Sequence, residues 1–215
     1  MRFKLLIFDW DGTLVDSQAR IVGSFHNAIA DLALPERSST QITHVIGLSL
    51  EIAIATLFPD ASSQQRLLLG QAYRHNFFNA TAKTSPLFSG VVDSLHAFHK
   101  AGYDLAVATG KSRQGLDQAL AETELKKLFH STRTADDTCS KPNPQMLHEI
   151  MDELARLPNE TLMIGDTDYD LQMAQNAGVA SVAVTYGMHD KSRLLACKPL
   201  ICIDSFSELQ TWLSQ

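Results

Sequence analysis

The sequence has few of the features that mark secreted, membrane-bound or nucleic-acid-binding proteins. Its 215 residues include only three cysteines, with no CxxC pair, and a sparse, odd number argues against a disulfide framework. The formal net charge of -6 and the lack of a basic run argue against nucleic acid and anionic membranes as partners. The first apolar run, residues 5–8, is too short for a signal or membrane segment. These absences favour a cytoplasmic protein that binds small molecules.

The sequence also lacks the residue patterns that are typical of zinc sites. The eight histidines are scattered, none has HxxxH spacing, and none lies beside a cysteine. Structural and catalytic zinc sites require clustered nitrogen and sulfur ligands, so we expect ordinary surface or core histidines.

Short β-type runs alternate with helical patterns over most of the chain, which is typical of a parallel α/β sheet. The expected strands are residues 5–8, 104–109, 161–165, 180–185 and 200–203. The expected helices between and after them are residues 112–124, 144–156, 168–177, 190–196 and 205–214. Asn143 and Pro144 fit a helix start, and Gly178 fits a helix end. The fold class predicted is α/β, with a three-layer Rossmann-like parallel sheet.

A long helical insertion interrupts this alternation after the first strand. Apolar residues between Ile21 and Leu32 recur on one helical face, and further helices are expected at 39–46, 49–57 and 62–82. The segment 83–90 contains Pro86 and Gly90 and is interpreted as the returning linker. The predicted domains are therefore an α/β core, residues 1–16 and 84–215, and an all-helical domain, residues 17–83.

Polar groups follow the expected strands where ligands bind in open parallel sheets, at the carboxyl ends. They are Asp9 and Asp11, then Thr109 and Gly110, then Lys141 before a helix, and finally the acidic run "GDTDYD" at 165–170. Together they offer carboxylates, a hydroxyl beside a flexible backbone, and a cation. This set suits a site that handles phosphate.

The spacing of Asp9 and Asp11 raises a separate question, because two like charges on the same side of an extended strand repel each other. A shared cation would hold them together. Mg²⁺ prefers oxygen ligands and keeps several waters, so it fits these carboxylates better than a nitrogen-binding metal would. The alternative is that the two aspartates lie in a solvated turn. The polar groups that follow the other strands make this interpretation less favourable.

Four motifs in order carry a resemblance to a known family. They are "DWDGTLVDS" (9–17), Thr109 in "VATGKS", Lys141 in "SKPNP" and "GDTDYD" (165–170). The chain resembles the haloacid dehalogenase superfamily, in its branch of phosphatases with a helical cap inserted after the first strand. The dehalogenases of that superfamily lack an equivalent of Asp11, so they fit less well.

The resemblance implies a role for each motif. Asp9 would be the nucleophile that forms an aspartyl-phosphate, and Asp11 the general acid and base, with its backbone carbonyl on the metal. Asp166 would be the third Mg²⁺ ligand, and Asp170 would support metal-bound water or Lys141. Thr109, Gly110 and Lys141 would bind the phosphoryl group.

Simpler interpretations compete at several positions. The acidic run at 165–170 also suits a helix start, and Asp168 is expected to be only a first-turn or capping residue. Lys111 is expected to be a surface lysine. Cys139, two residues before Lys141, is expected to be a bystander, although its oxidation would perturb the site.

Three functions from different classes remain open. A phosphatase for small phosphate monoesters leads, with phosphoglycolate as the first candidate substrate and pyrophosphate as an alternative. A sugar phosphomutase of the β-phosphoglucomutase type would carry a histidine where this chain has Ile21 and an arginine where it has Leu50. A phospho-aspartate signalling protein would lack both the insertion and a second aspartate that discharges the acyl phosphate.

The loop "VIGLSLEIA" (45–53) resembles the cap loop of phosphoglycolate phosphatases and bacterial pyrophosphatases, which makes Gly47 a candidate substrate-binding residue. A plain helix terminator is the competing interpretation. The expected partner is a small phosphorylated metabolite, and a monomer or a homodimer would fit.

Overall fold

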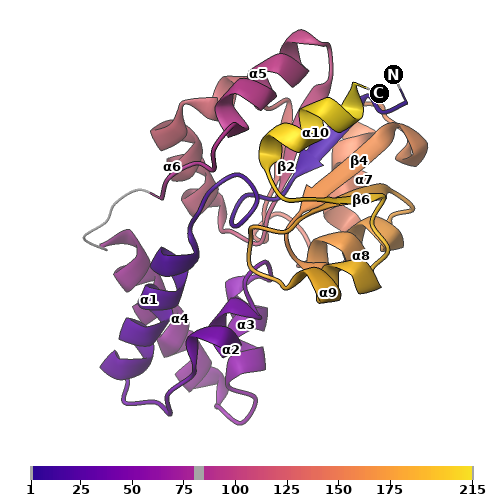
Figure 1. Cartoon of the computed structure of the whole chain (residues 1–215). Helices are drawn as coiled ribbons and strands as arrows, with labels where there is room; N and C mark the ends of the chain where they lie inside the picture. Colours follow the sequence, from indigo (N-terminus) through magenta and orange to yellow (C-terminus); the bar gives the residue numbers. More distant parts are fainter. Residues whose placement is uncertain (1, 80–84, 215) are drawn as a thin grey trace.

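The computed structural model describes residues 2–79 and 85–214. Its centre is a six-stranded sheet in the order β3-β2-β1-β4-β5-β6, and all neighbouring strands are parallel. The strands are β1 (Leu5–Phe8), β2 (Asp104–Ala108), β3 (Ser131–Arg133), β4 (Thr161–Gly165), β5 (Ala180–Val184) and β6 (Ile201–Ile203). Because β1 lies between β2 and β4, the first strand of the chain occupies the centre of the sheet (Figure 1).

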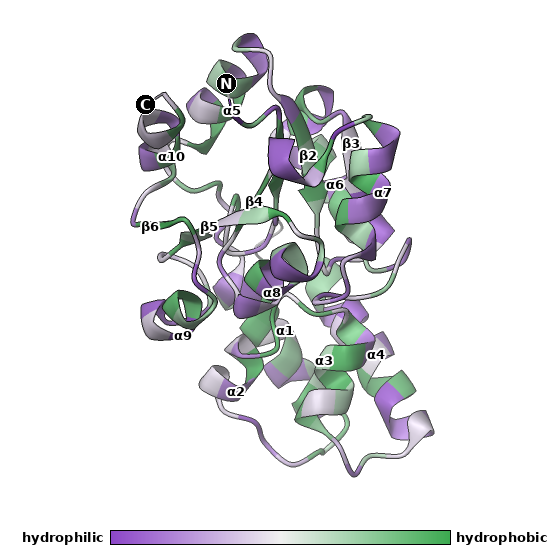
Figure 2. Cartoon of the chain, turned by 90° about the vertical axis from the view of Figure 1, so that its right-hand side faces the viewer, coloured by the Kyte–Doolittle hydropathy of each residue, from purple (hydrophilic) through white to green (hydrophobic). Residues whose placement is uncertain are grey.

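Helices cover both faces of the sheet and bury alternate residues of each strand. Leu6 and Phe8 face one layer, whereas Leu5 and Ile7 face the other. The first layer contains α5 (Val91–Lys100), α6 (Arg113–Thr123) and α10 (Phe206–Leu213). The second contains α7 (Gln145–Glu153), α8 (Asp168–Asn176) and α9 (Lys191–Ala196). Figure 2 shows the two-sided character of these helices, for example α7, which is hydrophobic on one side and hydrophilic on the other. The three-layer α/β prediction is confirmed.

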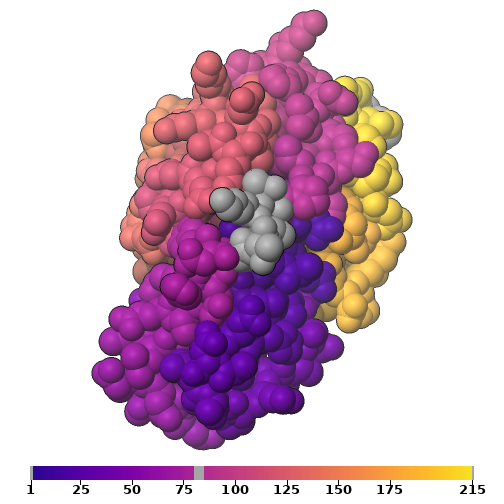
Figure 3. Space-filling model, turned by 90° about the vertical axis from the view of Figure 1, so that its left-hand side faces the viewer, coloured from indigo at the N-terminus to yellow at the C-terminus, as the bar shows by residue number. Residues whose placement is uncertain are grey.

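The remaining α-helices of the described residues follow β1 and form a separate cluster. They are α1 (Gln18–Asp31), α2 (Ser39–Thr43), α3 (Leu50–Leu57) and α4 (Ser63–Phe78). Phe25, Ile54 and Leu69 meet in an apolar core of their own. Capping boxes begin α2 at Ser38 and α4 at Ser62, and Ser49 caps α3. Figure 3 shows this cluster as a lower lobe of indigo and purple atoms beneath the rest of the molecule.

Most strand positions agree with the sequence prediction within a residue, but two elements of the core were not predicted. Strand β3 has only three residues at the edge of the sheet, two of which are half-buried, so it lacks an apolar run. Helix α5 buries Val91, Leu95 and Phe98, a spacing typical of an amphipathic helix. Helix α7 begins one residue later than predicted, with Pro144 in the capping position and Asn143 accepting a hydrogen bond from the Gln145 amide.

The predicted boundary between residues 83 and 84, and residues 80–82 of a predicted helix, lie outside the described residues. The boundary between residues 16 and 17 stays a prediction. Among the helices that the structure describes, none combines the length and apolar character needed to span a membrane.

Candidate active site

The polar groups predicted from the strand ends meet at one edge of the sheet. Asp9 follows β1, Thr109 follows β2 and Asp166 follows β4, and these three strands are adjacent. All three side chains are buried, with exposed fractions of 1% or less. Polar groups removed from water require partners, and the partners of each group show what this edge of the sheet can do.

Lys141 lies at the centre of the site. Its ammonium Nζ donates hydrogen bonds to Asp9 Oδ1 and Asp170 Oδ1, both at 2.6 Å, and its side chain is fully buried. Burial alone would lower the pKa of Lys141, but Asp170 and Asp9 outweigh that effect and hold the pKa above its usual value. A permanent positive charge therefore lies against the Asp9 carboxylate, and Asp170 contacts Lys141 as predicted.

Asp166 is fixed by groups from two other loops. Its Oδ1 accepts a hydrogen bond from the Thr13 hydroxyl at 2.7 Å, and its Oδ2 accepts one from the Met188 amide at 2.8 Å. The backbone at Gly12, with φ +84°, runs so close that a β-carbon there would lie 2.2 Å from Asp166 Oδ2. Only glycine combines this conformation with this approach, which accounts for the Gly after Asp11 in the first motif.

Three buried carboxylates form a cluster that could bind a metal ion. Asp9, Asp166 and Asp170 each offer an oxygen within 4.8 Å of the others. Burial raises the pKa of Asp9 to about 7 despite the opposing effect of Lys141, and burial with Asp9 and Asp170 nearby raises the pKa of Asp166 well above its usual value. Asp9 Oδ2 is buried without a hydrogen-bond partner. A buried Asp9 oxygen without a partner, next to carboxyl groups whose pKa values are raised, fits a cation-binding site.

Within this group the oxygens are not equally available. Both oxygens of Asp170 are already engaged, Oδ1 by Lys141 and Oδ2 by the Thr167 amide and hydroxyl. Asp9 keeps one free oxygen. Each oxygen of Asp166 accepts one hydrogen bond from a neutral donor, whereas Asp170 is bound to the Lys141 ammonium. The geometry therefore favours Asp9 and Asp166 as direct ligands of a cation and Asp170 as a support for Lys141.

The Asp11 side chain points away from the carboxylate cluster. It accepts a hydrogen bond from the Ser17 hydroxyl at 2.7 Å, and Lys111 Nζ lies 3.1 Å from both of its oxygens. The Lys111 side chain is only 10% exposed, and its ammonium also lies 5.0 Å from the centre of the Phe77 ring. The prediction that Lys111 is a surface lysine was wrong, because its partner is an aspartate 100 residues away in sequence.

The loop after β2 supplies the remaining predicted groups. The Thr109 hydroxyl accepts a hydrogen bond from the Lys111 amide at 3.3 Å. Gly110 touches the loop between α2 and α3, since a β-carbon on Gly110 would lie 2.5 Å from the Gly47 carbonyl oxygen. A β-carbon on Gly47, whose φ is +102°, would in turn lie 3.1 Å from the Thr167 hydroxyl. Gly47 therefore packs between two core loops.

Two polar contacts reinforce this junction between the inserted helices and the core. The Tyr169 hydroxyl donates to the His44 carbonyl at 2.9 Å, and the Ser49 amide donates to the Ser140 hydroxyl at 2.8 Å. Ser140 precedes Lys141, so the inserted helices contact a neighbour of the central lysine.

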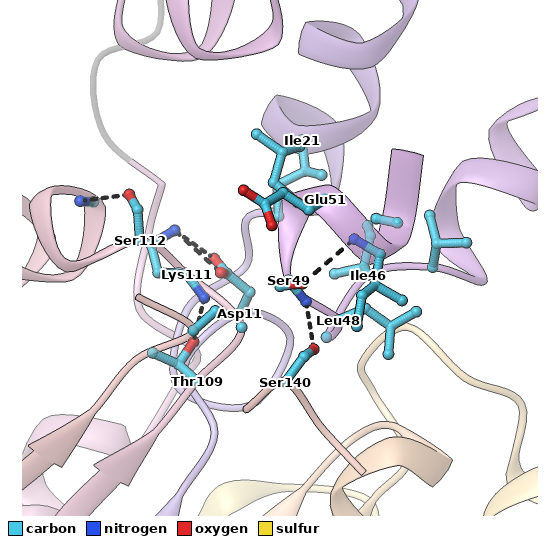
Figure 4. A pocket seen from close by; sticks show the side chains of 18 of the residues that line it. Asp11, Ile21, Ile46, Leu48, Ser49, Glu51, Thr109, Lys111, Ser112 and Ser140 are labelled. Carbon is cyan, nitrogen blue, oxygen red and sulfur yellow. Dashed lines mark hydrogen bonds and ion pairs between the residues drawn. The ribbon is translucent and has the colours of Figure 1, made fainter. Parts of the chain in front are cut away.

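A cavity of about 520 Å³ lies between the two parts of the molecule. Asp9, Asp11, Thr109 and Gly110 line its core side, and Figure 4 shows Asp11, Lys111 and Thr109 across from Ile46, Leu48 and Glu51. Its volume lies within the usual range for small-molecule sites. Ile21 and Leu50 both line it, so the positions at which a mutase would carry polar groups are apolar here.

Asp168 lies in the first turn of α8, as predicted, and it also has a structural role. Thr167 caps α8, whereas Asp168 accepts hydrogen bonds from Arg193 at 2.7 and 3.0 Å and lies 3.1 Å from His189 Nδ1. These partners lower the pKa of Asp168 although burial would raise it. The interaction ties α8 to α9, behind the site.

Sequence analysis missed several contributors to the site. Thr13 and Ser17 belong to the first motif, and their hydroxyl positions relative to the aspartates could have drawn attention to them. Lys111 and the Met188 amide gave no comparable signal, because their partners are distant in sequence. Cys139 is exposed and is not among the residues that line the cavity, and its role as a bystander stays a prediction.

Comparisons with known proteins agree with this geometry. Residues 6–184 match the family model described as "Haloacid dehalogenase-like hydrolase". A protein of Dickeya dadantii named "Probable phosphatase IndB" is 36% identical, over 95% of this chain and 91% of its own. A phosphoglycolate phosphatase of Aliivibrio fischeri is 30% identical, over 98% of this chain and 96% of its own.

A solved structure extends the similarity to the whole fold. The crystal structure of a predicted phosphoglycolate phosphatase from Haemophilus somnus has a TM-score of 0.89 and 25% sequence identity, and it covers 100% of this chain and 99% of its own. The inserted helices and the sheet thus have a known counterpart. With the four motifs at one edge of the sheet and a family match across most of its length, the chain belongs to the haloacid dehalogenase-like hydrolases.

Proposed function

We propose that the protein is a Mg²⁺-dependent phosphatase that hydrolyses small phosphate monoesters through an aspartyl-phosphate on Asp9. One observation carries the proposal: Asp9 lies at the cavity, paired with Lys141 on one oxygen and without a hydrogen-bond partner on the other. A carboxylate intended only for stability would have both oxygens satisfied. The phosphatase and phosphoglycolate phosphatase among the relatives support the same reaction class.

The donor set supports Mg²⁺ as the cation. Asp9 and Asp166 would hold it through carboxylate oxygens, with the Asp11 backbone carbonyl as the expected third protein ligand, and such oxygen-only sets suit a hard ion. When bound, Mg²⁺ would neutralise negative charge on the phosphoryl oxygens and keep Asp9 ionised near neutral pH.

In the first step, a carboxylate oxygen of Asp9 would attack phosphorus. A phosphorus–oxygen bond to Asp9 forms while the ester bond breaks, and the leaving oxygen takes a proton from Asp11. Lys141, the Thr109 hydroxyl and the Gly110 amide would contact the equatorial oxygens, where charge accumulates in the transition state.

In the second step, Asp11 would take a proton from water. The resulting oxygen attacks phosphorus, the acyl phosphate bond breaks, and Asp9 is regenerated as inorganic phosphate leaves. Ser17 and Lys111 hold the Asp11 carboxylate at the cavity, and so they would position it for both proton transfers.

The helices of residues 17–83 would act as a cap domain on the core of residues 1–16 and 84–215. Gly47 would shape the substrate side of the cavity through its contact with Gly110. Phosphoglycolate is the first substrate to assay, given the relative that carries its name. A cytoplasmic location and a monomeric or homodimeric state complete the proposal.

Phosphate release from 4-nitrophenyl phosphate tests the reaction. We expect turnover with Mg²⁺, loss of turnover after EDTA treatment, and recovery when Mg²⁺ is returned. Turnover that persists after thorough chelation, or that only Zn²⁺ restores, would contradict the proposed metal site.

A further inference from the structure

The wall of the cavity opposite Asp9 carries two charges on an otherwise apolar surface. The inserted helices contribute mainly side chains that cannot bind an ion, including Ile21, Phe25, Ile46, Leu50 and Phe77. Two ionic side chains also lie on this wall, Glu51 from α3 and Arg74 from α4. Charged groups that face a ligand cavity fix the orientation and identity of the ligand.

Two cationic side chains are among the described residues that line this cavity, Arg74 and Lys111. Asp11 forms an ion pair with Lys111 at 3.1 Å and neutralises it. Arg74 makes no hydrogen bond or ion pair within residues 2–79 and 85–214. Its guanidinium is therefore free to bind a group that enters with the substrate.

The packing around Arg74 directs it toward the groove between α3 and α4. Gly70, one turn earlier on α4, has no side chain, and a β-carbon placed there would lie 3.8 Å from an Arg74 terminal nitrogen and 4.0 Å from Leu50. Leu50 and Arg74 both line the cavity. The guanidinium thus lies beside an apolar cavity wall, and Arg74 as a whole remains exposed, so an entering group can reach it.

The phosphoryl group that is cleaved does not need Arg74. Thr109 and Gly110 line the core side of the cavity with Asp9, and Lys141 binds Asp9 from within the core. A second cation on the opposite wall matches a second anionic group, and guanidinium binds carboxylates and phosphoryl groups with two parallel hydrogen bonds.

We propose that Arg74 is a specificity-determining residue that binds a second anionic group, a carboxylate or a phosphoryl, on the leaving group of the substrate. The inference rests on the proposed phosphatase function and narrows its substrate class. Substrates with an uncharged leaving group would bind the same core groups but leave Arg74 unused.

Glu51 provides a second test, because its removal should change the substrate preference in the opposite direction to removal of Arg74. Its carboxylate points into the cavity across from Asp11 and Lys111 (Figure 4) and makes no hydrogen bond or ion pair with the residues that the structure describes. It would repel a second anionic group, so its removal should favour the substrates that removal of Arg74 disfavours.

The experiment compares kcat/KM for three substrates in the full chain: phosphoglycolate, pyrophosphate and ethyl phosphate. The last lacks a second anionic group. We expect Arg74→Gln to lower kcat/KM for phosphoglycolate or pyrophosphate, relative to ethyl phosphate, by about ten- to a hundredfold, the value of one charged hydrogen-bonded contact. The substrate that loses more identifies the second group as a carboxylate or a phosphoryl.

Arg74→Lys keeps the charge but loses the planar fork, so an intermediate loss is expected. Glu51→Gln should raise the ratio of kcat/KM for phosphoglycolate or pyrophosphate to kcat/KM for ethyl phosphate. Arg66→Gln is the matched control, because Arg66 lies on the same helix outside the lining of the cavity and binds the Pro59 carbonyl. It should leave the ratio between substrates unchanged.

Equal losses on all three substrates in Arg74→Gln would overturn the inference, as would a ratio that falls in Glu51→Gln. Turnover of 4-nitrophenyl phosphate by the unmodified protein separates these results from failure of the proposed function. Without that turnover the phosphatase assignment itself fails, whereas with it only the role of Arg74 is at stake.

Discussion

Gly47 and Gly110 meet backbone to backbone: the Gly47 carbonyl oxygen lies 2.5 Å from the point where a side chain on Gly110 would begin. The Leu48 carbonyl oxygen lies 2.6 Å from the same point. The loop of the inserted helices therefore rests on the core loop that follows Thr109, with no room for a methyl group between them. This contact closes one side of the cavity.

Gly110→Ala tests the contact. The added methyl group must displace the loop at Gly47, and overpacking of this kind typically costs about 1–3 kcal/mol. We expect kcat/KM for phosphoglycolate to fall by about tenfold, following that cost. Gly23→Ala is the control, because a β-carbon on this helical glycine meets nothing within 4 Å. It should stabilise the protein by about 0.5–1 kcal/mol. An equally active Gly110→Ala enzyme would show that the loop contact is dispensable.

Asp11→Asn should trap the covalent intermediate. With 4-nitrophenyl phosphate the leaving group needs little protonation, so attack by Asp9 proceeds, but water is no longer activated in the second step. We expect phosphorylated protein by intact-mass spectrometry, with the added mass on Asp9 in peptide analysis. Asp9→Asn should form no such species and lose turnover altogether. Phosphate on any residue other than Asp9 would refute the assignment of the nucleophile.

Lys111→Gln should impair catalysis although Lys111 lies outside the four motif positions. The change removes the ammonium that binds both oxygens of Asp11 at 3.1 Å, a charged contact worth about 1.5–3 kcal/mol. We expect kcat/KM to fall by at least about tenfold, with little change in melting temperature. Lys126→Gln, at an exposed position outside the lining of the cavity, is the control. Equal activities of the two variants would mean that Ser17 alone suffices to hold Asp11.

The raised pKa of Asp9 predicts how stability depends on pH. Burial raises this pKa to about 7 from 3.8, so between these values the folded protein holds a proton that the unfolded chain has released. The contribution of Asp9 to the free energy of unfolding is complete below about pH 3.8 and is lost as the pH rises through 7. Without metal, the melting temperature of the protein should therefore decline more from pH 5 to 8 than that of Asp9→Asn.

Mg²⁺ should stabilise the protein more at pH 8 than at pH 5.5, because it binds the ionised carboxylate. Melting curves with EDTA or Mg²⁺ at both pH values provide the measurement. Identical pH profiles for the protein and Asp9→Asn in EDTA would contradict the raised pKa.

The sheet was largely predictable because its strands are buried on both faces and read as short apolar runs. β3 was not, since an edge strand of three residues with Thr132 and Arg133 half-buried carries no such signal. Helix α5 did carry a signal, in the spacing of Val91, Leu95 and Phe98. That helix begins at Val91, directly after the predicted linker of residues 83–90.

At the site, motif order located Asp9, Lys141 and Asp166, because their strands determine where they lie. Contacts between residues that are distant in the sequence were harder to predict. No local pattern joins Lys111 to Asp11, since the contact depends on how the loops after β1 and β2 turn toward each other. Likewise, the use of both Asp170 oxygens by Lys141 and Thr167 appears only in three dimensions.

The central position of β1 has a consequence for synthesis on the ribosome. This strand ends at Phe8, whereas its partners β2 and β4 begin at Asp104 and Thr161. At about 5–20 residues per second, the strand waits several seconds or longer for its neighbours to be translated. Helices α1–α4 emerge in the meantime and supply most of their apolar core, to which Met188 is added later, so we expect them to compact first. Nascent chains halted after residue 100 should protect these helices from protease while β1 remains open to chaperones, and early protection of β1 would contradict this order.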